Sequence, residues 1–158
     1  MAPKHWLMKS DPETYTIDDL ERDGVTEWDG VRNYRARNFM RDQMSAGDSI
    51  LFYHSNADPT GIYGIAEVAS EPHPEGAQFD SKSRYFDSGS TREAPTWWCV
   101  DVRHVETFPA PVTRDELRET PGLAELMVLN RGMRLSITPV TRQEFEIIRK
   151  AGRAKVRR

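Results

Sequence analysis

The sequence predicts an α+β fold, a small mixed β-barrel or curled sheet of about five to six strands surrounded by short helices. The strand-like segments are short and bounded by turn residues, and the helix-like segments between them are equally short. The strands do not alternate regularly with long crossover helices, as a doubly wound fold requires. A chain of 158 residues suits one domain, expected at 1–150 and followed by a basic tail at 151–158.

Each expected strand has its own local signal. Residues 5–9 form the first, which Asp11-Pro12 closes because a residue before proline disfavours helix. Gly64 lies inside another and predicts a bulge or the close approach of a second backbone. The longest is expected to direct Trp98, with Val100 and Val102, toward the core. The remaining strand segments are 49–55, 62–68, 97–105 and 134–140.

The helices are predicted from capping residues and apolar spacing. Thr16 with Asp19 forms an N-cap for a short helix that ends near Gly24. An apolar stripe at helical spacing, from Tyr34 to Met44, predicts one helix over 31–44. Two capping boxes open further helices, Thr113 to Glu116 and Thr141 to Glu144.

Two polar segments have no regular pattern. Segment 70–96 is rich in Ser, Pro, Gly and charge, yet its Phe79, Tyr85 and Phe86 would be costly to leave in water. We therefore expect it to pack back on the domain. The basic residues at the C-terminal end, from Lys150 to Arg158, are interpreted as a solvated, frayed terminus.

Composition excludes several function classes. The net charge is −3 and the pI about 5.8, which counts against broad neutralisation of nucleic-acid phosphates but not against binding of a single nucleotide. No apolar run approaches the roughly 18 residues of a membrane helix. A single cysteine, Cys99, rules out an internal disulfide and suits a reducing compartment. A soluble, cytoplasmic protein that does not contact membranes is expected.

The chain shows no catalytic motif. Phosphate loops, dinucleotide fingerprints and nucleophile elbows are missing. Cys99 lies in an apolar strand, which favours a buried, inert thiol. The histidines are scattered without metal-ligand spacing, at His5, His54, His73 and His104. We therefore expect a binding module that is not an enzyme and needs neither cofactor nor metal.

Polar and aromatic residues gather at strand ends and turns. Trp28 lies in a turn, outside any helical or strand pattern, where its ring can stack on a planar base. The Ser and Asn side chains near it can recognise a ring edge, and the helix start near Val31 offers amides to an anion. The alternative is that Trp28 is a core residue and that Arg32 to Arg41 form a solvated helix face. Composition alone favours neither.

The same segments resemble the EVE domain family, one of the PUA-like folds, which also include the YTH readers of methylated adenine. The resemblance covers essentially the whole chain. It rests on WLMKSDP (6–12), WDGVRNYRARN (28–38), GDSILFYHS (47–55), GIYGIAEV (61–68), WCVDV (98–102) and LNRGMRLSITPV (129–140). It implies a β-barrel ringed by helices, with a pocket for a flipped-out modified base under a lid in 78–96.

By position the resemblance also implies a set of site residues. Trp28 corresponds to the first wall of an aromatic cage, with Lys9 and Ser10 on its rim. Trp97 is the candidate for the second wall. The other expected ligand-binding residues are Asn33, Asn38, Tyr53, Ser55 and Asn56, and the expected phosphate contacts are Arg32, Arg35 and Arg37.

The implied partner is nucleic acid, DNA or RNA, that carries a modified cytosine or a methylated adenine. Alternatives are a sensor of free nucleotides or other small molecules, and an accessory subunit of a modification or restriction system with a nuclease or modifying enzyme as partner. A hydrolase would require a metal or a carboxylate cluster. A monomer is the expected state.

Overall fold

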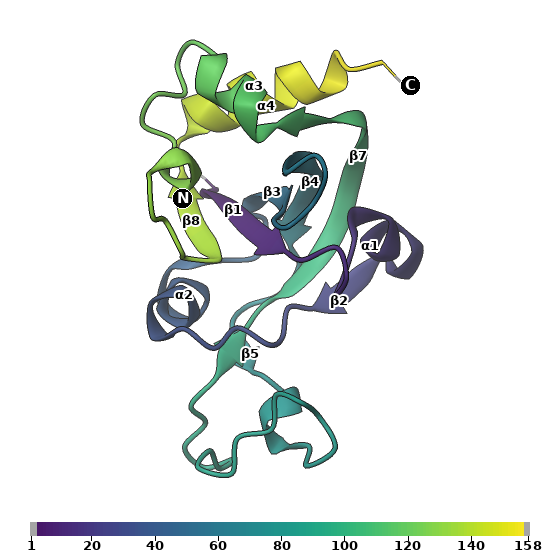
Figure 1. The fold of residues 1–158 in the computed structure, drawn as a ribbon. Helices are drawn as coiled ribbons and strands as arrows, with labels where there is room; N and C mark the ends of the chain where they lie inside the picture. Colours follow the sequence, from purple (N-terminus) through teal and green to yellow (C-terminus); the bar gives the residue numbers. More distant parts are fainter. Residues whose placement is uncertain (1–2, 157–158) are drawn as a thin grey trace.

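The computed structural model describes residues 3–156. Its centre is a curled six-stranded sheet, a half-barrel in which the strand order is β2-β7-β4-β3-β1-β8 (Figure 1). The neighbours β1 and β3 are parallel, whereas the other neighbouring strands of the sheet are antiparallel. The strands are β1 His5–Ser10, β2 Val25–Glu27, β3 Ser49–His54, β4 Gly61–Val68, β7 Asp101–Thr113 and β8 Ile137–Val140. The predicted α+β class with a curled mixed sheet is confirmed.

Short helices pack around this sheet. They are α1 Ile17–Asp23, α2 Tyr34–Asn38, α3 Arg114–Glu119 and α4 Arg142–Arg153, with a π-helical turn η1 Phe39–Gln43 and 3-10 turns η2 Ala77–Phe79 and η3 Met127–Leu129. Both predicted capping boxes are confirmed, with Thr113 and Thr141 as N-caps. The cap expected at Thr16 is also present, and it too is a full box.

The helix predicted over 31–44 differs from the structure. It begins only at Tyr34, because the Asn33 side chain accepts a hydrogen bond from the Ala36 amide at 3.0 Å and so caps the first turn. After Asn38 the backbone widens into η1, in which the Met44 amide bonds to the Phe39 carbonyl. The wider turn buries Phe39 and Met44 together.

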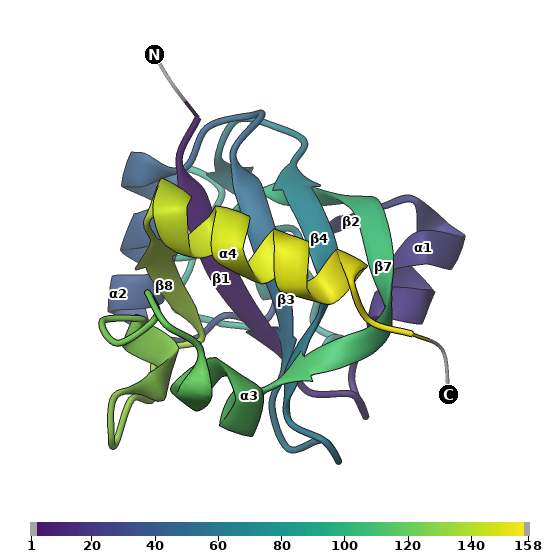
Figure 2. The ribbon, with the colours of Figure 1, turned by 90° about the horizontal axis from the view of Figure 1, so that it is seen from above.

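Both faces of the sheet are buried, which explains why its strands are apolar on both sides. The alternation within β3 directs Ile50 and Phe52 into a cluster under α1 and α2. Leu51 and Tyr53 lie in the other cluster with Phe145 of α4. Figure 2 shows α4 running across β1, β3 and β4 on that second face.

The strand predicted at 97–105 is in fact two strands. The short β6, Trp98–Cys99, ends before Val100, whose carbonyl accepts a hydrogen bond from the Trp28 amide at 2.9 Å, and β7 then runs from Asp101 to Thr113. The break changes the alternation, so that Trp97 is buried while Trp98 is half-buried. The expectation that Trp98 faces the core was wrong.

Gly64 behaves as predicted. The β3–β4 and β4–β7 ladders shift register beside it, and a Cβ at this position would lie 2.4 Å from the Glu106 carbonyl oxygen. The strands therefore approach closely only because the side chain is absent.

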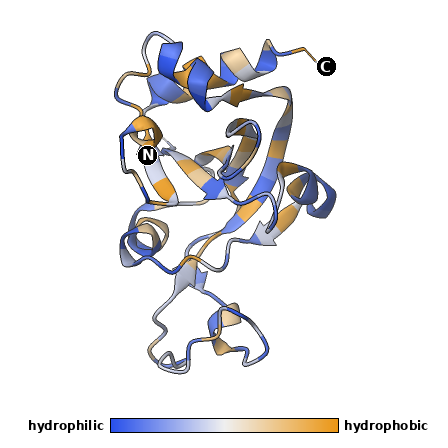
Figure 3. Ribbon diagram, in the orientation of Figure 1, coloured by the Kyte–Doolittle hydropathy of each residue, from blue (hydrophilic) through white to orange (hydrophobic). Residues whose placement is uncertain are grey.

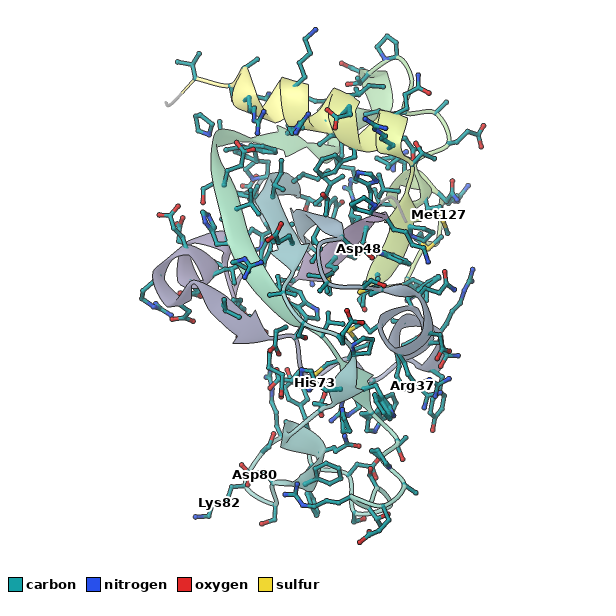
Figure 4. All side chains as sticks on the ribbon, turned by 180° about the vertical axis from the view of Figure 1, so that it is seen from behind. Arg37, Asp48, His73, Asp80, Lys82 and Met127 are labelled. Carbon is teal, nitrogen blue, oxygen red and sulfur yellow. The ribbon has the colours of Figure 1, made fainter. Side chains whose placement is uncertain are left out.

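Residues 75–97, here called the excursion, leave the half-barrel through a two-stranded ladder, β5 His73–Pro74 with β6. They form the separate lower part of Figure 1, and Figure 3 shows that they are mostly hydrophilic or neutral in hydropathy. Figure 4 places Asp80 and Lys82 at the far end and His73 at the junction. The predicted packing against the domain holds for Tyr85, whereas Phe86 remains substantially exposed.

Gln78 holds the excursion together. Its side chain is fully buried and makes four hydrogen bonds, to the carbonyls of Glu75 and Trp97, from the Trp97 amide and from the Ser90 hydroxyl, all between 2.6 and 2.9 Å. A polar clamp, in place of an apolar core, therefore fixes this segment.

The basic end of the chain is better ordered than a frayed terminus. Arg153 forms an ion pair with Glu106 at 2.7 Å, and Lys155 pairs with Glu116. Arg157 and Arg158 lie outside the described residues. Within 3–156, no helix combines the length and the apolar character needed to cross a membrane.

Candidate functional site

A pocket of about 350 Å³ opens beside the end of β1. The turn after β2 and the excursion close its other sides. This size lies within the range of small-molecule sites. Its walls are Lys9, Ser10, Asp11, Thr14, Tyr15, Thr26, Glu27, Trp28, Asp29, Gly30, Val31, Arg32, Arg84, Tyr85 and Ser136. The predicted residues Trp28, Lys9, Ser10 and Arg32 thus meet in one place.

Trp28 is both a core residue and a pocket wall. It is 9% exposed and packs edge-on against Phe52, with ring centroids 5.6 Å apart and planes at 89°. Its amide bond to Val100 fixes the backbone beside the ring. The two interpretations of this tryptophan are therefore compatible, because one part of the indole completes the core while another part lines the pocket.

Tyr85 and Tyr15 supply the other aromatic surfaces. Tyr85 comes from the excursion, and its ring lies so close to Gly30 that a Cβ there would be 2.5 Å from the ring. Gly30 also has a φ of 86°, which disfavours other residues. The glycine of the Trp-Asp-Gly turn thus permits the excursion to close over the pocket.

A part-buried ion pair supports the same turn. Glu75 is 1% exposed and accepts two hydrogen bonds from the Arg32 guanidinium, at 2.7 and 2.9 Å, and a third from the Gly30 amide at 2.8 Å. Arg32 also donates to the Tyr85 carbonyl. The assignment of Arg32 to phosphate binding needs correction, because its charge is already neutralised within the protein.

The ionisable groups of the pocket are perturbed. Desolvation, then repulsion from Glu75 and Glu27, raises the pKa of the Asp29 carboxyl. Desolvation lowers the pKa of the Lys9 ammonium. Asp29 therefore offers the pocket an acceptor and Lys9 a donor, and a polar ligand would stabilise the charge of each.

Tyr53 and Trp97 are not part of the pocket wall. Tyr53 is buried on the opposite face of the sheet, because it alternates with Phe52 along β3. Trp97 is buried beside the pocket, where its indole N–H donates to Asp87 at 2.8 Å. Tyr15 and Tyr85, and not Trp97, accompany Trp28 on the wall.

The four remaining polar candidates, Asn33, Asn38, Ser55 and Asn56, also lie outside the pocket wall. Asn33 is occupied as the α2 cap, and Asn38 accepts hydrogen bonds from Arg37 at 2.8 and 3.1 Å. The Ser55 amide bonds to the Ser10 carbonyl, and Asn56 donates to Asp11 at 3.2 Å. Each therefore has a structural partner that explains its position.

Arg35 and Arg37 differ from Arg32. Neither forms a salt bridge with a carboxylate within 3–156, and Arg37 donates only to the Thr96 carbonyl and the Asn38 side chain. Their charges are thus available to an external anion.

One group of potential metal ligands does come together. Ligand atoms of Glu27, His73 and Cys99 lie within 4.8 Å of one another. The two ring nitrogens of His73, however, already face the Pro74 carbonyl at 3.0 Å and Asp101 at 2.9 Å. Burial raises the pKa of the Cys99 thiol well above its usual range, as predicted for an inert thiol.

Comparison with known proteins places the chain in a family. The EVE domain model matches residues 4–151. Human thymocyte nuclear protein 1 is 38% identical over 162 residues, which cover 91% of this chain and 72% of that protein. The chicken protein of that name is 37% identical over 163 residues, 91% of this chain and 66% of its own length, slightly under two thirds.

A solved structure agrees with this match. The crystal structure of human thymocyte nuclear protein 1, described as in complex with DNA containing 5-methylcytosine, superposes with a TM-score of 0.86 at 34% identity. The alignment covers 96% of this chain and 99% of that one. The half-barrel is therefore a PUA-like fold, and the chain belongs to the EVE domain family.

Proposed function

We propose that this chain is a non-catalytic binding module that takes one modified cytosine from DNA into the pocket beside Trp28. The observation that carries this proposal is the pocket itself, which combines aromatic walls with a carboxylate and an ammonium group. The similarity to a protein crystallised with DNA containing 5-methylcytosine supports it.

Asp29 and Lys9 match the edge of cytosine. Its exocyclic amino group is a donor, which the Asp29 carboxylate accepts, as carboxylates do from the cytosine amino group in DNA. Its ring nitrogen and carbonyl are acceptors, to which Lys9 donates. A methyl group at the 5-position then contacts aromatic surface, whose burial is favourable. Extrusion of the base costs a few kcal/mol, so a duplex should bind more weakly than a single strand that carries the same base.

Replacing Trp28 by alanine is expected to weaken binding by about 1–3 kcal/mol, the usual contribution of one base–aromatic stack. The measurement is fluorescence anisotropy with short DNA and RNA strands that each carry a single modified base. Trp98→Ala is the matched control, since Trp98 is a half-buried tryptophan outside the pocket wall. Unchanged affinity in the Trp28 variant would show that the indole does not contact the bound base.

Asp29→Asn is expected to reduce discrimination between 5-methylcytosine and thymine, which differ at the exocyclic 4-position and in whether the adjacent ring nitrogen carries a proton. The wild type should prefer 5-methylcytosine by about 1–3 kcal/mol, because thymine presents a carbonyl to the carboxylate. The asparagine amide both donates and accepts, so it tolerates either base. Competition titrations with otherwise identical strands measure the ratio, and an equal preference in both proteins would contradict this role.

A sensor of free nucleotides would use the same pocket but would not need the basic surface around it. Arg35 and Arg37 favour a polymer, since neither cation has a carboxylate partner among residues 3–156. Two phosphate contacts on a single strand predict a slope of about −1.4 for log K against log salt concentration. Free nucleosides would show no such slope.

A further inference from the structure

Tyr34 is a large aromatic residue that the fold leaves in solvent. It is 61% exposed, at the first position of α2. Its ring lies nearly parallel to the indole of Trp97, with centroids 5.1 Å apart and planes at 10°. One face of Tyr34 is thus covered, and its position in the stack holds the ring in one orientation.

The outer face of Tyr34 is open. The Arg37 guanidinium lies 4.8 Å from the Tyr34 centroid and 5.9 Å from the Trp97 centroid. A cation over the outer face of Tyr34 would be much farther from Trp97, because the two rings are themselves 5.1 Å apart. Arg37 therefore flanks the edge of the stack and leaves the outer face to a ligand.

Trp97 joins this stack to the pocket. It is 6% exposed and held by Asp87 and by Gln78. On its own ring lies the Arg32 guanidinium, 4.8 Å from the centroid, and Arg32 is a pocket wall. Tyr34 is therefore separated from the pocket by a rigid wall of a few side chains and not by a flexible loop.

The charges around Tyr34 suit a nucleic-acid backbone. Arg35 and Arg37 follow it in sequence and have no carboxylate partner among residues 3–156, whereas Arg41 in the next turn is paired with Asp42 at 2.8 Å. An exposed aromatic ring beside uncompensated arginines is the combination that binds single-stranded bases.

We propose that the Tyr34–Trp97 stack is a second binding site, which takes the base next to the one in the pocket and leaves the intervening phosphate to Arg35 and Arg37. This inference rests on the proposed function and extends it from one base to two. When the modified base is extruded, the neighbouring base loses its stacking contact with it, and stacking against Tyr34 replaces that contact. The site therefore contributes affinity without recognising sequence.

The test uses short single-stranded DNA with one 5-methylcytosine, together with two further strands in which an abasic residue replaces the 5′ or the 3′ neighbour. Tyr34→Leu still covers Trp97 but offers no aromatic face, and Tyr34→Phe keeps the face. We expect Tyr34→Leu to weaken binding of the intact strand about tenfold and to leave binding of one abasic strand unchanged. Tyr34→Phe should bind the intact strand like the wild type.

The Trp28→Ala variant separates this inference from the proposed function. If Trp28→Ala weakens binding while Tyr34→Leu does not, the second site is wrong and the pocket stands. Equal losses on the intact and both abasic strands would assign Tyr34 to the support of Trp97 and overturn the second site. Unchanged binding in both variants would overturn the pocket and the second site together.

Discussion

Replacing Arg32 by methionine is expected to lower the free energy of unfolding by about 3 kcal/mol, the lower end of the cost of breaking a buried ion pair. The lower end applies because the Arg32 side chain is 27% exposed. The loss arises from Glu75, which is left as a buried carboxylate with only the Gly30 amide as a partner. Urea unfolding followed by tryptophan fluorescence measures the difference.

A second substitution tests the cause. Arg32→Met with Glu75→Gln removes the unpaired charge while an amide oxygen remains for Gly30, so most of the stability should return. Arg35→Met is the matched control, and its effect should stay within about 0.5 kcal/mol because Arg35 is exposed. If the single and double variants lose the same stability, the loss comes from the missing guanidinium contacts and not from the unpaired buried charge.

Gln78→Leu is expected to release the excursion while the half-barrel stays folded. Leucine has a similar volume but leaves the Trp97 amide and the Glu75 carbonyl without a hydrogen bond, each at a cost of about 1–3 kcal/mol. It also removes one bond from the Trp97 carbonyl and one from the Ser90 hydroxyl. The summed cost exceeds the free energy that this mostly polar segment gains by packing, so the segment is expected to unfold locally. Amide hydrogen exchange should show lost protection at Trp97 and retained protection in β3 and β4.

The same substitution at an exposed position supplies the comparison. Gln143 is exposed in the first turn of α4, and Gln143→Leu should leave exchange in the excursion unchanged. Loss of protection throughout the sheet in Gln78→Leu would show that the excursion and the half-barrel unfold as one unit. Base binding should also weaken, since Tyr85 and Arg84 reach the pocket only when the excursion is folded.

Much of the fold was predictable because its signals are local. The capping boxes act within four residues, and the alternation of β3 sets which face each side chain takes. Gly64 was also predictable, because a glycine inside a strand often marks a bulge or the close approach of another backbone. The π-helical turn and the break at Val100 were not, since both depend on contacts with distant segments.

The site was predictable only in part. Trp28, Lys9 and Ser10 follow from their place in family motifs, and the structure brings them to one pocket. Tyr85 has no such signal, since its position depends on Gly30, which is distant in sequence. Sequence reasoning also missed Asp29, although its place between Trp28 and Gly30 in the Trp-Asp-Gly turn was a signal that could have found it.

The polar clamp at Gln78 has an evolutionary consequence. The excursion enters and leaves through the adjacent strands β5 and β6, so its ends stay together whatever lies between them. Lineages can accumulate substitutions, or change its length, without disturbing the apolar sheet that keeps the protein folded. Because the excursion also supplies Tyr85 and Arg84, such drift alters the pocket first. Under the proposed function, one inherited scaffold can thus diversify its preference for base modifications through a single exchangeable segment.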